Sequence, residues 1–197
     1  MDPQRLRATI RAARAGREEA YQEILAAFGP RLYGYFVRAT GSRHDAEDLL
    51  GEVMLRLVGR LPEYDEKGRF EQWVFRIASN LVRDRIRRAK VRPMTSSLEA
   101  ESPGGGVLGE TICGRGRPAE AGLRHEEVSQ ALNEALERLD EPSRQMVLLR
   151  HFAEMSFREI AEIFQCPIGT VLAKVHRALK ALRTVLEAND ESDAGRL

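Results

Sequence analysis

The chain has 197 residues, of which 43% are hydrophobic and 31% charged, and its basic and acidic side chains nearly cancel to a net charge of +1. This composition predicts a globular protein with one domain or two small ones and excludes a chain that is basic throughout. No apolar run is long enough to span a membrane, and Cys113 and Cys166 are too few and too far apart for a disulfide framework or a cysteine metal motif. We therefore expect a cytoplasmic protein without membrane insertion, metal or cofactor.

The first ninety residues are predicted to be helical, because apolar residues recur at helical spacing and no convincing strand alternation is found. Residues 1–16 are rich in arginine and lack the apolar core of a signal peptide, so they predict a short surface helix. Pro30 stands where another helix could begin, since proline is tolerated in a first helical turn, and Gly29 and Gly41 punctuate the chain around it.

Residues 44–57 carry two adjacent apolar rows, so about half of this predicted helix is apolar. That width suits an internal core and a partner surface together; a plain amphipathic helix is the alternative. Acidic residues in its first turn are favoured by the helix dipole. The main row consists of Leu50, Met54, Leu57 and Leu61, and the row beside it of Leu49, Val53 and Leu57.

Residues 70–88 form the next predicted helix, which contains three aromatic residues and then several arginines. Residues 83–92 contain six basic side chains and one acid, whereas residues 45–66 contain seven acids and two arginines. Aromatic rings stack on unpaired bases and arginines neutralise phosphates, a pairing that suits single-stranded DNA. The alternative is that Trp73 and Phe75 belong to the core and the arginines are solvated.

Residues 91–122 contain seven of the sixteen glycines, three prolines and no aromatic residue. Such a segment buries too little apolar surface to offset the entropy of ordering it, so we expect a flexible linker. A long ordered loop is the alternative, although loops of this length are uncommon inside compact domains.

Helical periodicity returns after the linker and ends in a helix-turn-helix pattern. One helix is predicted near 128–139, and Pro142 opens the next. Ser156 and Glu159 form a capping box that starts a short helix, and Pro167 is set for the first turn of a longer one. The longer helix places its polar residues opposite an apolar stripe, so it could enter a DNA major groove; a helical hairpin with a solvated basic face is the alternative. The stripe consists of Ile168, Val171, Val175, Ala178 and Leu182.

Two stretches together resemble a known family. The sequence DAEDL at 45–49, followed by FEQWVFRIASNLVRDRIRR at 70–88, resembles region 2 of the extracytoplasmic-function sigma factors, and SFREIAEIFQCPIGTVLAKVHRALKALR at 156–183 resembles their region 4. Two motifs in the right order are more specific than either alone. The resemblance implies a subunit that directs core RNA polymerase to promoter DNA, is not an enzyme, and is commonly held by an anti-sigma factor.

The resemblance also implies three sets of site residues. The helix that contains DAEDL would bind the clamp helices of the largest polymerase subunit through Asp45, Glu47, Asp48, Leu49 and Glu52. The next helix and the loop before it would recognise and melt the −10 element through Phe70, Trp73, Arg76, Asn80, Arg83, Arg87 and Arg88. The last helix would read the −35 element and touch the polymerase flap through Thr170, Lys174, His176, Arg177 and Lys180.

Two residues depart from the family pattern. Gly51 stands where the family usually has glutamine, and a glycine inside a helix costs about 1 kcal/mol relative to alanine. Leu172 lies in the usual polar run of the recognition helix and cannot donate to a phosphate or a purine. The −35 preference of relatives therefore does not transfer to this chain.

The predicted architecture is all-α, with two small helical domains. We expect a region 2 domain at 1–90, the linker at 91–122, a region 4 helix-turn-helix domain at 123–187 and a frayed polar tail at 188–197. A sigma-independent helix-turn-helix regulator is the alternative function, but it leaves DAEDL unexplained. An enzyme is disfavoured, because no nucleophile elbow, phosphate-binding glycine loop or metal-ligand spacing is present.

Overall fold

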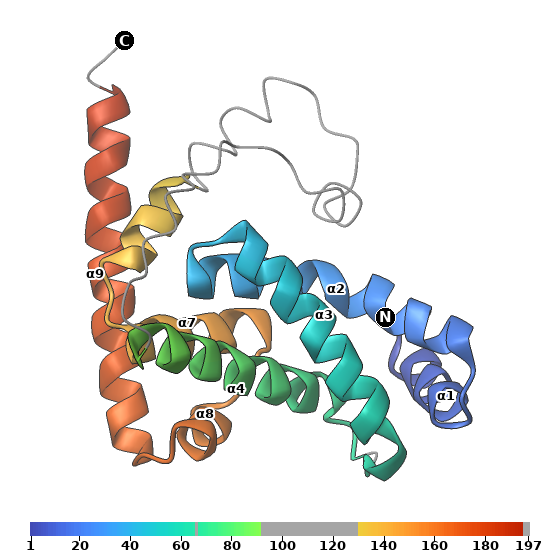
Figure 1. The fold of residues 1–197 in the computed structure, drawn as a ribbon. Helices are drawn as coiled ribbons and strands as arrows, with labels where there is room; N and C mark the ends of the chain where they lie inside the picture. The colour runs from blue at the N-terminus through green and yellow to red at the C-terminus, as the bar shows by residue number, and fades with distance from the viewer. Residues whose placement is uncertain (66, 92–129, 195–197) are drawn as a thin grey trace. The chain divides into compact units, whose positions relative to one another are not determined.

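The structure is a computed structural model that describes residues 1–65, 67–91 and 130–194 (Figure 1). Every regular element in these ranges is a helix, which confirms the all-α prediction. The chain divides into two compact units, Met1–Gly114 and Arg115–Leu197. The predicted linker lies outside the described residues, apart from the last residue of α4. No helix in the described part is both long enough and apolar enough to cross a membrane.

The N-terminal unit is a bundle in which α2 packs on both α3 and α4, while α1 packs on α2 and η1 (Figure 1). Asp2 caps α1 by accepting hydrogen bonds from the backbone of Gln4 and Arg5, and the Ser42 hydroxyl caps α3 by accepting one from Asp45 N at 3.1 Å. The elements are α1 (Pro3–Arg14), α2 (Glu18–Thr40), α3 (Arg43–Arg60), the short 3₁₀ helix η1 (Leu61–Glu63) and α4 (Phe70–Val91).

Pro30 lies inside α2, so the prediction that a helix begins there is wrong. Proline removes one backbone donor from the ladder, but it is exposed, and the buried face of α2 continues past it through Phe28 and Leu32. Packing of that continuous face outweighs the lost hydrogen bond. The helix ends at Gly41, whose left-handed conformation (φ 73°) suits glycine.

Aromatic side chains fill the centre of the N-terminal unit. Phe70 packs edge-on against Phe28 with ring centroids 5.6 Å apart, and Phe75 packs against Tyr35 at 5.7 Å. Phe70 and Phe75 are almost fully buried. Phe75 therefore belongs to the core, as the alternative interpretation of the sequence predicts, and Phe70 belongs to the core as well.

The C-terminal unit contains the predicted helix-turn-helix. Its elements are a helix described over 130–137, α7 (Glu141–Phe152), α8 (Phe157–Phe164) and α9 (Ile168–Ala194). The Ser156–Glu159 capping box is present and starts α8. Gln165 then turns the chain with a left-handed backbone (φ 51°), and the stripe from Val171 to Leu182 packs α9 against α7 and α8.

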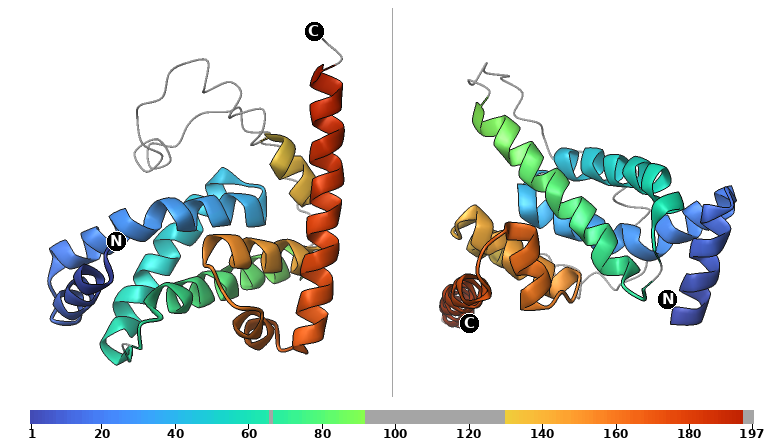
Figure 2. Two further views of the ribbon diagram at one scale, coloured as in Figure 1. Left: turned by 180° about the vertical axis from the view of Figure 1, so that it is seen from behind. Right: turned by 90° about the horizontal axis from the view of Figure 1, so that it is seen from below.

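Helix α9 extends further than the sequence predicted. Residues 188–194, expected to be a frayed tail, are helical and continue past α7 and α8 (Figure 2). The chain contains neither glycine nor proline between Gly169 and Gly195, so nothing in the sequence stops the helix earlier. The buried stripe of α9 begins one turn later than predicted, because Ile168 is 48% exposed whereas Val171 is fully buried.

Candidate nucleic-acid and partner surfaces

A basic groove lies between α3 and α4. It has a volume of about 320 Å³ and contains three of the residues predicted to bind the −10 element, namely Asn80, Arg83 and Arg87. Two arginines of α3 that the sequence analysis did not select complete it. The full lining is Arg56, Arg60, Ile77, Asn80, Arg83, Asp84 and Arg87.

The two missed arginines, Arg56 and Arg60, are four residues apart and therefore share a face of α3. Both lie in the segment 45–66, which has seven acids, so composition alone does not mark them as phosphate contacts. Arg56 Nη2 lies 2.7 Å from a carboxylate oxygen of Glu52, and Arg87 Nη2 lies 2.9 Å from Asp84. These pairs are at least partly exposed and therefore weak, so the arginines can exchange a carboxylate for a phosphate at little cost.

The other predicted −10 residues occupy different environments. Trp73 is partly exposed, and its ring is tilted against Tyr64 with centroids 4.6 Å apart. Phe70 supports Trp73 from the core, at 5.6 Å, and has no free face for a base. Arg76 and Arg88 are exposed on α4 but do not line the groove. Among the selected aromatic residues, only Trp73 therefore offers surface for stacking in the described part of the unit.

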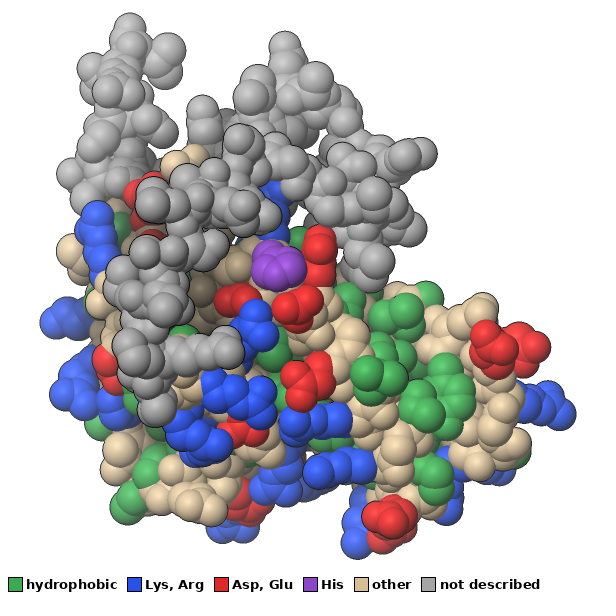
Figure 3. Space-filling model, viewed as in Figure 1, with side chains coloured by type: hydrophobic (Ala, Val, Ile, Leu, Met, Phe, Trp, Pro, Cys, Tyr) green, Lys and Arg blue, Asp and Glu red, His purple; other side chains and the backbone are tan. Residues whose placement is uncertain are grey.

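The acidic start of α3 is joined to the basic part of α4. Arg85 Nη2 donates to Asp45 and also lies 3.4 Å from Asp48, so one guanidinium bridges two of the predicted polymerase-binding residues. The hydrogen bond from Arg85 to Asp45 raises the pKa of Arg85, although partial burial opposes it. On the face drawn in Figure 3, acidic and basic side chains are interspersed. The two charged segments of the sequence are thus paired in space.

The rest of the predicted polymerase-binding set is divided between core and surface. Leu49 is 2% exposed and belongs to the core, whereas Glu47 and Glu52 are partly exposed. An apolar row that the sequence analysis did not single out runs along the outside of α3, where Leu55 is 75% and Val58 46% exposed. Gly51 precedes them on the same face at helical spacing and is exposed as well.

On α9 the predicted residues lie along one exposed side, with a single exception. Lys174 is turned toward α7, where its Nζ lies 2.8 Å from a carboxylate oxygen of Asp140 and 3.4 Å from the Ser143 hydroxyl. Leu172, the second departure from the family pattern, is 44% exposed. The exposed predicted residues are Thr170, His176, Arg177 and Lys180.

The contact between Lys174 and Asp140 also sets the charge of the carboxylate. Partial burial tends to raise the pKa of Asp140, but the hydrogen bonds from Lys174 and Ser143 outweigh it and lower the pKa below its ordinary value. Asp140 is thus ionised at neutral pH and joins α9 to the start of α7.

Comparison with known families matches the chain twice. Residues 17–92 match sigma-70 region 2, and residues 122–182 match sigma-70 region 4. The chain is 31% identical over 179 residues to an ECF RNA polymerase sigma factor of Bacillus subtilis, SigW, covering 90% of this chain and 94% of that protein. It is 25% identical over 178 residues to the RNA polymerase sigma-H factor of Pseudomonas aeruginosa, covering 90% and 92%.

Two solved structures have a similar fold. The complex of CnrH with the cytosolic domain of CnrY aligns with a TM-score of 0.60 and 23% identity, over 92% of this chain and 97% of that one. The complex of the sigma factor RpoE with the anti-sigma factor NepR from Bartonella quintana aligns with a TM-score of 0.59 and 19% identity, over 85% and 96%.

Proposed function

Because this chain belongs to the extracytoplasmic-function sigma factors of the sigma-70 family, we propose that it directs core RNA polymerase to a set of promoters and helps to open the DNA there. The observation that carries this function is the presence of both sigma-70 regions, each on its own helical unit and each with a basic surface. It catalyses no covalent step and acts in the cytoplasm, where bacterial polymerase works.

The helix-turn-helix unit binds duplex DNA at the −35 element. Helix α9 presents Thr170, Arg177 and Lys180 on its exposed side, and a major groove admits one helix. Arg177 is the better candidate for a base edge, while Lys180, one turn further along, neutralises phosphates. Lys174 contributes less to recognition of −35 bases than the sequence predicts, because Asp140 and Ser143 already bind its ammonium group. It serves to fix α9 against α7.

The N-terminal unit captures the −10 element as a single strand. Unpaired bases stack on Trp73, and their phosphates follow the basic groove formed by Arg56, Arg60, Arg83 and Arg87. Unstacking a base costs a few kcal/mol, so several such contacts are needed to offset it. Phe70 and Phe75 contribute indirectly by holding Trp73 and α4 in place.

The outer face of α3 binds core polymerase. Leu55 and Val58 supply an exposed apolar centre, and the acidic residues Asp48 and Glu47 border it with charge. An apolar centre with a polar rim is the usual anatomy of a protein interface. Leu49 supports this face from inside and does not touch the partner.

An anti-sigma factor is the natural regulator of this chain. One of the two solved relatives is bound to an anti-sigma factor and the other to the cytosolic domain of a second protein. A free sigma factor would compete continuously for core polymerase, so an external partner that covers its binding faces keeps it inactive.

The decisive experiment is transcription in vitro with purified core polymerase on a genomic DNA library, followed by sequencing of the RNA starts. The chain should create a set of starts that core polymerase alone does not make, with shared elements upstream. If it binds DNA specifically without polymerase and creates no starts, the sigma-independent regulator is the correct function. That alternative accounts only for the residues matched to region 4.

A further inference from the structure

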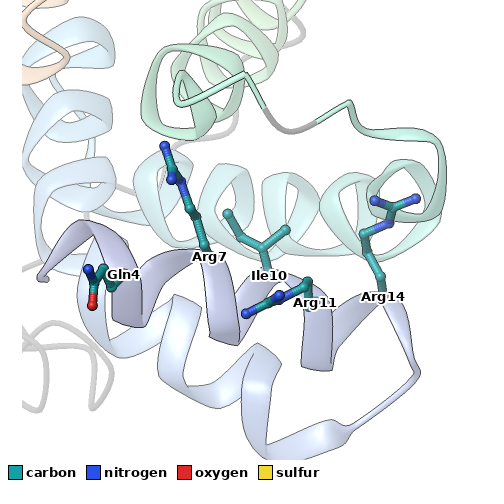
Figure 4. A pocket seen from close by; sticks show the side chains of 5 residues that line it. All are labelled: Gln4, Arg7, Ile10, Arg11 and Arg14. Carbon is teal, nitrogen blue, oxygen red and sulfur yellow. The ribbon is translucent and has the colours of Figure 1, made fainter.

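Helix α1 carries a row of arginines that the function described above does not use. Arg7, Arg11 and Arg14 line a hollow of about 700 Å³ together with Gln4 and Ile10 (Figure 4). In Figure 4, Arg7 and Arg14 point to the same side of α1, with Arg11 between them along the helix. Among the residues that the structure describes, no acidic side chain lines this hollow. The row lies before residue 17, where the match to region 2 begins.

No ion pair within the described residues explains why positions 7 and 11 are arginines. Both are exposed, and neither forms an ion pair with a residue that the structure describes. The helix dipole favours positive charge in the last turn of α1, which contains Arg11 and Arg14, but Arg7 lies before that turn. Arg5 differs, because it projects from another side of the helix and lies 3.8 Å from Glu23. Exposed arginines that have no acidic partner among the described residues are suited to a negative ligand.

The row borders the segment that leads into α4. Arg14 Nη2 donates to the carbonyl oxygen of Pro62 at 3.2 Å, and a Cβ added to Gly68 would lie 3.9 Å from Arg7 Nη2. Helix α1 therefore lies beside η1 and close to Gly68. The same segment contributes Tyr64, which packs on Trp73, the residue assigned above to stacking on unpaired bases.

We propose that Arg7 and Arg11 bind backbone phosphates of the single-stranded promoter DNA, next to the bases held at Trp73. The inference rests on the proposed function and extends its −10 surface onto α1. Guanidinium groups match phosphate oxygens with paired hydrogen bonds. From Arg7 to Arg14 the helix rises about 10 Å, which is the length of about three stacked nucleotides.

A protein partner fits the row less well than DNA. The one apolar side chain in its lining, Ile10, is 1% exposed, so the hollow offers no apolar anchor of the kind that dominates protein interfaces. A row of arginines beside a stacking platform is instead the arrangement that single-stranded DNA requires.

The test uses the complete holoenzyme and a forked promoter probe chosen from the mapped starts. One phosphate of the single strand at a time is replaced by a neutral methylphosphonate, and dissociation constants are measured across a salt series. Neutralising the contacted phosphate should weaken binding of the unaltered protein about fivefold near 0.1 M salt. Arg7→Ala or Arg11→Ala should remove the sensitivity to that phosphate and reduce the salt slope by about 0.7.

Arg5→Ala is the matched control, because it removes the same charge from another side of the same helix. It should keep the phosphonate sensitivity of the unaltered protein. Wild-type sensitivity and salt slope in Arg7→Ala and Arg11→Ala would overturn the proposal while leaving the proposed function intact. So would a loss of affinity for core polymerase measured without DNA, because that would make the row a protein surface. If the unaltered holoenzyme does not recognise any promoter, the proposed function fails and this inference fails with it.

Discussion

Gly51 is a residue whose lack of a side chain the fold does not require. It lies inside α3, is exposed, and a Cβ built there would have no heavy atom within 4 Å. Gly51→Ala should therefore raise the free energy of unfolding by about 1 kcal/mol, because it removes the backbone entropy cost of glycine in a helix. Urea denaturation followed by circular dichroism measures the change.

Gly29→Ala provides the contrast for that measurement. Gly29 is also inside a helix, but a Cβ there would lie 3.2 Å from Leu25 Cδ1, so crowding should cancel most of the gain. Equal stabilisation by both substitutions would contradict the packing around Gly29. Gly51→Gln, which restores the usual family residue, additionally tests whether this face of α3 touches polymerase.

Lys174 is expected to act through the fold more than through the DNA. Lys174→Ala and Asp140→Asn remove the same ion pair, and asparagine is as favourable as aspartate at the N-cap position that Asp140 occupies in α7. Each should destabilise the protein by less than about 1 kcal/mol, because the pair is partly exposed. Binding to a panel of −35 variants should weaken evenly in both. If Lys174→Ala alters preference at one base position and Asp140→Asn does not, the ammonium reads a base.

The same ion pair makes a prediction about pH. Since the pKa of Asp140 is lower in the folded protein than in the unfolded chain, its stabilising contribution is complete above the unfolded value, about 4. The contribution disappears as the pH falls through the lower, folded pKa. The stability difference between the unaltered protein and Asp140→Asn should be constant near neutral pH and shrink below about pH 4. A difference that stays constant down to pH 2 would contradict the assigned pKa direction.

At the scale of helices, Arg85 bridges Asp45 and Asp48 and so joins α4 to α3. The two acids could serve polymerase binding or the packing of these helices. Asp48→Arg reverses a charge that is half exposed at the border of the apolar face of α3. It should weaken binding to core polymerase by about 1 kcal/mol or more while leaving helicity intact. Equilibrium pull-down and circular dichroism measure the two quantities.

Arg85→Ala is the control, because it breaks the bridge while leaving both acids in place. It should lower stability and keep most of the affinity for core polymerase. An equal loss of affinity in Arg85→Ala and Asp48→Arg would mean that the acids matter through packing alone.

The helices themselves were largely readable from sequence, because their signals are local. The capping box of α8, the start of α7 at Pro142 and the stripe of α9 each depend on residues a few positions apart. Pro30 does not interrupt α2, because the buried face of this helix continues past the proline, a tertiary effect that outweighs a local rule. The polar composition of residues 188–197 predicts fraying, but α9 extends to Ala194 because no glycine or proline ends it earlier.

The candidate surfaces were less predictable, since they depend on which helices meet. Lys174 meets an aspartate 34 positions earlier in the chain, and Arg85 meets two acids about 40 positions earlier. Arg56 and Arg60 join the groove only because α3 lies along α4. Periodicity identified α3 as broadly apolar, but only packing distinguishes Leu49, which is buried, from Leu55, which is exposed.

At the scale of the whole chain, regulation could come from an external partner or from the segment between the two units. That segment contains Glu99, Glu101 and Glu110, which could meet the arginines of α4. Exposed ion pairs contribute about 0–1 kcal/mol each, so three give at most a partial block that depends on salt. We therefore expect deletion of residues 99–110 to leave promoter and polymerase affinity unchanged at low salt. A gain of about tenfold or more that vanishes at high salt would favour self-inhibition.

The division of the chain into two compact units, each with a hydrophobic core of its own, has a consequence for how such proteins diversify. A substitution that alters one half of the promoter signature does not disturb the packing of the domain that reads the other half. After gene duplication, each copy can therefore change its preference for one promoter element while it still recognises the ancestral form of the other element. New regulons can arise by such single steps, without passing through a variant that recognises nothing.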